Sequence, residues 1–148
     1  MAIWKVRLAG GFVLLLVASL NGSLRHAVLG LAVGAVGGFL LEYVGVLRLN
    51  LWSYTGRFPK YGERFPKGEA FLHLVVSWGL IGMVAALLWQ WVSIGWLAFL
   101  LSFLFPILCW EVPNIRRKSW QYRAPAWLVL AGWLLTLLVF RGVFVAVP

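Results

Sequence analysis

Five mostly apolar stretches follow one another along the chain, and short polar segments separate them. They run over Ile3–Leu20, Ala27–Val46, Ala70–Trp89, Trp96–Pro113 and Pro125–Phe140. A helix that crosses a bilayer needs about 20 mostly apolar residues, and about 17 suffice where the helix ends adapt. The pattern therefore predicts an all-α integral membrane protein, a bundle of about five transmembrane helices in one polytopic domain over residues 1–148.

The connections between these stretches alternate between tight turns and longer segments. Residues 21–25 and 90–95 are short and polar, so we expect antiparallel helical hairpins on either side of each turn. Residues 47–68 and 114–124 form the two longer connections, and five crossings place both of them on the same side as the N-terminus. In an alternative topology with four crossings, the first helix lies in the membrane interface, and the two long connections are still on the same side of the membrane.

Composition agrees with this class of protein and excludes others. Apolar residues make up 63% of the chain and charged residues 11%, whereas soluble domains carry about 45–50% and about 25%. Together with a mean hydropathy of +0.92, these values exclude a disordered chain and a soluble enzyme fold. The net charge of +9 does not indicate a nucleic-acid partner, because in so apolar a chain positive charge reports orientation and contact with anionic headgroups.

The distribution of basic residues predicts the orientation in the membrane. The side with the N-terminus and both long connections receives Lys5, Arg7, Arg48, Arg57, Lys60, Arg64, Lys67, Arg116, Arg117, Lys118 and Arg123, and the other side receives only Arg25 and Arg141. Basic residues accumulate in cytoplasmic loops. We therefore expect a multi-pass protein of the cytoplasmic (inner) membrane, with a cytoplasmic N-terminus, cytoplasmic long connections and an external C-terminus.

Two segments of the chain repeat one pattern. Glu42 is followed by Trp52-Ser53-Tyr54, and Glu111 is followed by Trp120-Gln121-Tyr122, in each case before a further apolar helix. Both copies run in the same direction through the membrane, so they predict a parallel internal repeat with a pseudo-twofold axis along the membrane normal. The repeat units are about residues 27–92 and 96–148, which pairs the second helix with the third and the fourth with the fifth.

The glutamates at the ends of apolar helices are the first candidates for chemistry. Glu42 shares a helix face with Gly30, Gly34 and Gly38, a small-residue stripe that lets another helix approach closely, so its carboxyl group is expected to face protein. This stripe is also a candidate contact for a second copy of the chain or for a partner in a membrane complex. Because the repeat puts Glu42 and Glu111 at similar depth, we expect them to face each other across a cavity on the cytoplasmic side.

A second set of polar residues lies on the third predicted helix. Glu69, His73 and Ser77 recur every four residues and share one face. A rigid helix cannot fold this stripe into a catalytic triad, so we expect a hydrogen-bonded polar seam that holds helices together. The alternatives are a carboxylate–histidine metal site built from Glu42, Glu69, His73 and Glu111, and a catalytic role for Glu69 and His73 beside the other two glutamates. We expect no bound metal, and the single Cys109 excludes an intramolecular disulfide.

Aromatic and polar residues near the long connections are candidates to bind a ligand. Trp78, Trp110 and Trp133 lie deeper than the other tryptophans and are expected to line a cavity. The full set of candidate binding residues comprises Trp52, Tyr54, Trp110, Trp120, Tyr122, Asn50, Asn114, Arg116 and Arg117. With these side chains, a lipid or quinone can rest its tail among the helices and its phosphate against the arginines.

The segment from Glu42 to His73 resembles a known family. Its acid, its Trp52-x-Tyr54 and its Pro66-x-x-Glu69 are similar to the small membrane-embedded lycopene cyclase domain of carotenoid-producing bacteria, archaea and fungi. The resemblance implies a cofactor-free, acid-initiated cyclisation of a polyene within the bilayer. That family places two adjacent acids after its proline, where this chain has Gly68-Glu69.

Elementary chemistry agrees with that reaction class. Protonation of a carbon–carbon double bond or an epoxide needs a neutral carboxylic acid in a dry pocket, and aromatic faces stabilise the resulting carbocation. Three classes of function follow from the sequence. They are a small membrane enzyme or binding protein for an isoprenoid or lipid, a structural or accessory subunit of a membrane complex, and a dimeric small-solute transporter.

Overall fold

The computed structural model describes residues 3–54, 68–117 and 120–146, without the side chains of residues 3, 4, 69, 120 and 146. Each of the five apolar stretches is helical. The long helices are α1 (Ile3–Leu20), α2 (Leu24–Glu42), α3 (Glu69–Trp91), α4 (Gly95–Pro106) and α6 (Ala126–Ala146). Within the described ranges, four helical segments are long and apolar enough to cross a membrane, namely Leu24–Arg48, Ala70–Trp91, Gly95–Arg116 and Ala126–Val145. The chain is therefore a predominantly helical membrane protein.

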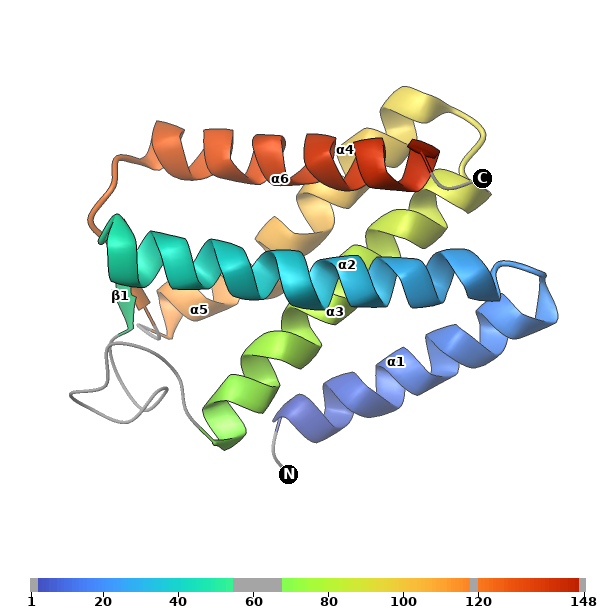
Figure 1. Cartoon of the computed structure of the whole chain (residues 1–148), viewed down its shortest axis with the longest axis horizontal. Coiled ribbons are helices and arrows are strands. Elements are labelled where there is room, and N and C mark those ends of the chain that lie inside the picture. The colour runs from blue at the N-terminus through green and yellow to red at the C-terminus, as the bar shows by residue number, and fades with distance from the viewer. Residues whose placement is uncertain (1–2, 55–67, 118–119, 147–148) are drawn as a thin grey trace.

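The helix ends gather at two ends of the molecule. In Figure 1, the turn between α1 and α2 and the turn between α3 and α4 lie at one end, which we call the turn end. The C-terminal end of α2 and the N-terminal end of α6 lie at the other, which we call the loop end. At the turn end, the Trp91 indole N–H donates to the Ser23 hydroxyl at 2.9 Å, which joins the two hairpin turns. The predicted antiparallel hairpins are thus present.

Two helices widen into π-helical turns beside the predicted acids. The π-helix η1 (Tyr43–Arg48) continues α2 directly after Glu42, and the π-helix η2 (Ile107–Glu111) continues α4 and ends at Glu111. Pro106, the last residue of α4, lacks an N–H group and crowds the preceding turn, which explains the change of helix type there. A short helix, α5 (Val112–Arg116), follows. The kink expected at this proline is therefore a widened turn.

The two Trp-x-Tyr segments pair as a small antiparallel ribbon that the hydropathy pattern does not indicate. Strand β1 (Trp52–Tyr54) and strand β2 (Trp120–Tyr122) place Trp52 opposite Tyr122, Ser53 opposite Gln121, and Tyr54 opposite Trp120. Tryptophan and tyrosine favour extended backbone, which accounts for strands in these positions. The central pair is Ser53 and Gln121, so the middle residues of the two Trp-x-Tyr motifs lie directly opposite each other.

The glycine stripe of α2 packs against α3 of the same chain. A Cβ atom added at Gly34 would collide with the Trp78 carbonyl oxygen, and one added at Gly30 would collide with the Gly82 carbonyl oxygen. This close approach is what the small-residue pattern predicts. Because α3 covers Gly30, Gly34 and Gly38, these residues are buried within the molecule and are no longer an open surface for a second copy or another partner.

Candidate functional site

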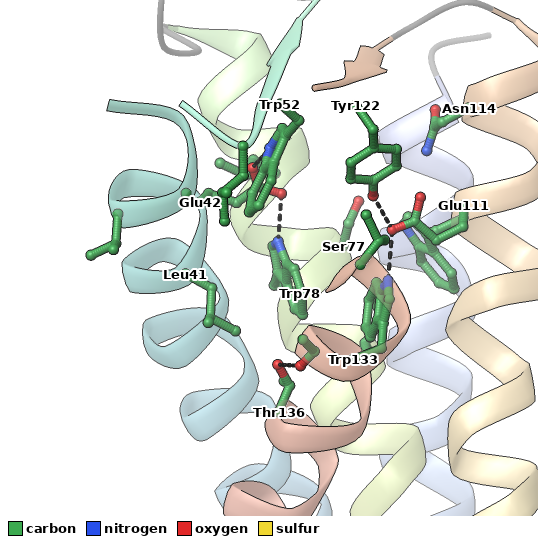
Figure 2. A pocket seen from close by; sticks show the side chains of 18 of the residues that line it. Leu41, Glu42, Trp52, Ser77, Trp78, Glu111, Asn114, Tyr122, Trp133 and Thr136 are labelled. Carbon is green, nitrogen blue, oxygen red and sulfur yellow. Dashed lines mark hydrogen bonds between the residues drawn. The ribbon is translucent and has the colours of Figure 1, made fainter. Parts of the chain in front are cut away.

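A cavity of about 210 Å³ lies at the loop end, among the helices and beneath the ribbon. Helices α2, α3 and α6 contribute to its wall together with η2, β1 and β2, and Figure 2 shows it from close by. Its polar and aromatic lining residues are Arg7, Glu42, Trp52, Tyr54, His73, Ser77, Trp78, Trp110, Glu111, Asn114, Tyr122, Trp133 and Thr136. Most of the other lining residues are aliphatic, so the cavity is an apolar chamber with a few polar groups.

Glu42 is buried in the cavity wall and accepts three hydrogen bonds. Its side chain is 6% exposed, and its Oε2 atom accepts from the Trp52 indole N–H at 2.9 Å and from the Tyr54 hydroxyl at 2.7 Å. Its Oε1 atom accepts from the Trp78 indole N–H at 3.1 Å. Gly45 makes this arrangement possible, because a side chain there would occupy the position of the Trp52 ring.

Glu111 has a closely matching environment. Its residue is 7% exposed, and its Oε1 atom accepts from the Tyr122 hydroxyl at 2.5 Å and from the Trp133 indole N–H at 2.7 Å. Figure 2 shows Tyr122 above this carboxyl group and Trp133 below it. Each glutamate therefore binds the tyrosine of its own Trp-x-Tyr motif and a tryptophan of the following long helix. We call these groups the Glu42 unit and the Glu111 unit.

Aromatic contacts join the two units. The rings of Trp78 and Trp133 stack with centroids 5.1 Å apart and an interplanar angle of 22°. Trp52 and Tyr122 meet edge to face at 6.1 Å across the ribbon. Such contacts contribute about 0.5–1.5 kcal/mol each beyond the area they bury. Both carboxyl groups thus line one cavity, as the repeat in the sequence predicts.

The partners of the carboxyl groups differ in what they can do with a proton. An indole N–H can only donate, so the tryptophans fix the glutamate oxygens as acceptors. A tyrosine hydroxyl can donate or accept, so Tyr54 and Tyr122 can exchange a proton with their glutamates. Burial raises the pKa of Tyr54 well above its ordinary value, which keeps that hydroxyl protonated at neutral pH.

Arg7 of α1 is a lining residue that the sequence did not single out. Its Nη1 atom donates to His73 Nε2 at 2.6 Å and to Ser77 Oγ at 2.5 Å, and its guanidinium lies 4.5 Å from the centroid of the Trp110 ring. Because arginine can only donate, Nε2 of His73 accepts and the imidazole is neutral. An arginine about one turn into an apolar helix needs polar partners, and this feature of the sequence could have identified Arg7 as a site residue.

Other predicted residues lie in several places. His73, Trp110 and Asn114 line the cavity, whereas Asn50, Arg116 and Arg117 are exposed and are not among its lining residues. Asn50 takes a left-handed backbone conformation with φ of 53°, at the turn between η1 and the ribbon. The side chains of Glu69 and Trp120, and the Pro66 of the family-like motif, lie outside the described part. The expected Glu69-His73-Ser77 seam is therefore seen only at His73 and Ser77, which share Arg7.

Within the described ranges, no three His, Cys, Asp or Glu side chains lie close enough to hold a metal ion together. Comparison of the chain with protein-family models, with curated proteins and with solved structures found no significant match. The cavity and its lining residues are therefore the features of the chain that bear on its function.

Proposed function

We propose that the protein binds the apolar end of an isoprenoid or lipid in this cavity and acts on it by acid-initiated cyclase- or isomerase-type chemistry without a cofactor. One observation carries the proposal. Two buried carboxyl groups open into a single apolar chamber, and each is hydrogen-bonded to a tyrosine that can pass it a proton. The volume of about 210 Å³ is smaller than the roughly 300 Å³ at which drug-sized pockets begin, so it suits the end group of a longer chain.

The geometry supplies what this chemistry requires. A carboxyl group in its neutral form donates a proton to a double bond, and exclusion of water lets that form persist. The positive charge that develops on carbon is stabilised by aromatic faces, of which Trp78, Trp110 and Trp133 are buried in the lining. Tyr54 and Tyr122 then connect each glutamate to the ribbon. The resemblance to the lycopene cyclase domain, carried by Glu42, Trp52 and Tyr54, belongs to this proposal.

An internal duplication fits the same reasoning. The Glu42 and Glu111 units use equivalent hydrogen bonds, and the ribbon pairs their motifs about a common centre. A pseudo-twofold axis along the membrane normal through this centre would exchange α2 with α4 and α3 with α6. Such a symmetry would place two similar carboxyl groups at one depth. The end group of the bound isoprenoid or lipid could then lie between the two acids.

We further propose that all five long helices cross the membrane, with the loop end in the cytoplasm. Arg7 near the start of α1 contacts His73 near the start of α3, while the end of α1 leads into the turn beside Ser23 and Trp91. Helix α1 therefore extends over the same depth as its neighbours. Of the eleven basic residues assigned to the loop end, nine lie outside α1 and Lys5 and Arg7 lie near its start, which favours the cytoplasmic side.

The function is tested by identifying the bound molecule and following its conversion. Native mass spectrometry of gently extracted protein is expected to show an isoprenoid or lipid adduct. In liposomes containing an acyclic isoprenoid polyene, E42Q and E111Q are each expected to slow conversion at least about 100-fold. E63Q makes the same chemical change at a glutamate of the long connection over residues 47–68, and it should leave the rate unchanged.

The same experiment separates the proposal from its alternatives. Bare protein in the mass spectrum, with no conversion of the polyene, contradicts it and favours a structural or accessory subunit. A bound adduct with no conversion reduces the function to binding. A dimeric transporter needs a polar path to the turn end, and Thr136 is the deepest polar side chain labelled in the cavity, so no observation favours that class.

A further inference from the structure

The Glu42 unit places a buried acid among neutral partners. Its three hydrogen-bond donors, two indoles and one phenol, carry no charge. No ion pair to Glu42 is present among the residues that the structure describes. In water-poor surroundings an isolated carboxylate is costly, so the group must either hold a proton or meet a positive charge.

The charges around Glu42 do not supply that positive charge. The ionisable groups that face it across the cavity are Tyr54 of β1, His73 of α3, Glu111 of η2, Tyr122 of β2 and Arg7 of α1. Arg7 is the one formally cationic side chain among the described lining residues, and it is engaged by His73, Ser77 and the Trp110 ring. Among the described lining residues, Glu42 therefore has no cationic partner.

The aromatic wall is suited to a cation. Six aromatic side chains line the cavity, namely Trp52, Tyr54, Trp78, Trp110, Tyr122 and Trp133. Aromatic faces attract ammonium groups by about 0.5–2 kcal/mol each, more where water is excluded. The position of the Arg7 guanidinium over Trp110 shows that one of these rings already attracts a cation.

We propose that the cavity also binds an organic cation, a tertiary or quaternary ammonium group on a short apolar body, in exchange for the proton held by Glu42. The cation takes the place of the proton as the neutralising charge, its apolar body contacts the aliphatic wall, and the released proton passes to solvent. This activity goes beyond the proposed function, which needs only a neutral hydrocarbon end group.

The test uses the whole protein in detergent and two probes of nearly the same shape. One probe is hexyltrimethylammonium, and the other is 2,2-dimethyloctane, in which carbon replaces the charged nitrogen. Binding is followed by quenching or shift of the tryptophan fluorescence. We expect the cation to bind at least about tenfold more tightly than the hydrocarbon. Its affinity should rise about tenfold per pH unit while the carboxyl group is protonated, since binding and proton release are linked.

Two further measurements make the result specific to Glu42. In weakly buffered solution, the wild-type protein should release about one proton for each cation bound, a readout that needs no variant. E42Q should lose the preference for the cation and its pH dependence, because the amide has no proton to exchange. E63Q serves as the matched control and should keep both.

The outcomes distinguish this inference from the proposed function. Equal binding of both probes without proton release overturns the cation site and leaves an apolar pocket that can still hold an isoprenoid. Binding of neither probe overturns both proposals. Retention of cation preference in E42Q also contradicts the inference, because it places the responsible charge elsewhere.

Discussion

At the scale of residues, an indole N–H group donates to each of the two buried carboxyl groups. Trp78 is the partner of Glu42 Oε1, and Trp133 shares Glu111 Oε1 with Tyr122. Loss of one partner of such a buried hydrogen bond leaves the remaining group unsatisfied, at a cost of about 1–3 kcal/mol. The three buried tryptophans of the cavity, Trp78, Trp110 and Trp133, therefore have unequal roles.

This inequality can be measured by comparing two Trp→Phe variants. W78F removes the donor to Glu42, whereas W110F removes an indole N–H that is buried without a hydrogen-bond partner among the described residues. Both lose similar volume from the same cavity wall. We expect W78F to lower the free energy of unfolding by about 1–3 kcal/mol more than W110F. Denaturant unfolding in detergent, followed by circular dichroism, measures the difference, and equal losses would contradict the role given to the Trp78 N–H.

At the scale of elements, the approach of α2 to α3 decides where Glu42 points. Glycines of both helices meet, and a methyl group at Gly34 or Gly82 would collide with backbone atoms of the facing helix. In a membrane, helices associate through such close packing because lipid provides no hydrophobic driving force between them. The same contact brings Trp78 beside Gly38 and within reach of Glu42.

We predict that G34A destabilises the protein by about 1–3 kcal/mol, since the facing Trp78 carbonyl cannot move aside without displacing α3. G142A in α6 is the matched control, because its new methyl group would meet no atom within 4 Å. G142A should leave the free energy of unfolding unchanged or raise it by up to about 1 kcal/mol, because alanine reduces the chain entropy of the unfolded state. Thermal unfolding of the two variants compares them, and a tolerated G34A would show that the helices pack less tightly than described.

At the scale of the whole molecule, both carboxyl groups, the ribbon and Arg7 gather at one end of the bundle. The five crossings that we propose would put this loop end, the N-terminus and most basic residues on the cytoplasmic side, and the turn end outside. Any lipid-derived ligand would then enter the cavity near the inner leaflet.

Single cysteines in a C109A background test this orientation. N21C and S93C at the turn end are expected to react with a membrane-impermeant maleimide on cells in which the reagent can reach the outer face of the cytoplasmic membrane. L49C and R117C at the loop end should react only after the inner membrane is permeabilised. All four positions are exposed, so access to the reagent depends on the side of the membrane. The opposite pattern would reverse the orientation.

An N-terminal epitope tag decides the number of crossings. Five crossings keep the tag on the protected side together with L49C. A first helix that lies in the interface at the turn end would instead expose the tag together with N21C. Protease digestion of the tag, measured on the same cells, separates these cases.

Local hydropathy determined much of the architecture. The apolar stretches from Ile3 to Leu20 and from Ala70 to Trp89 became helices with bounds within two residues of those expected. Burial of Glu42 followed from its glycine face, because a helix interface is the alternative to lipid for such a group. The spacing of each Trp-x-Tyr motif from its glutamate also placed the two motifs at one end. These features depend on helix period and length, which a single segment encodes.

Tertiary structure decided which groups meet. The ribbon pairs residues about 70 positions apart. Likewise, Trp78 reaches Glu42 from another helix, and Arg7 reaches His73 across 66 positions. No local periodicity encodes such pairs, because they depend on how closely the glycines let α2 approach α3 and on how Pro106 redirects the end of α4. The exposed positions of Arg116 and Arg117 were decided in the same way, since the direction of α5 turns them away from the cavity. The sequence by itself thus determined the long helices and the burial of Glu42, whereas the packing of helices decided the contents of the cavity.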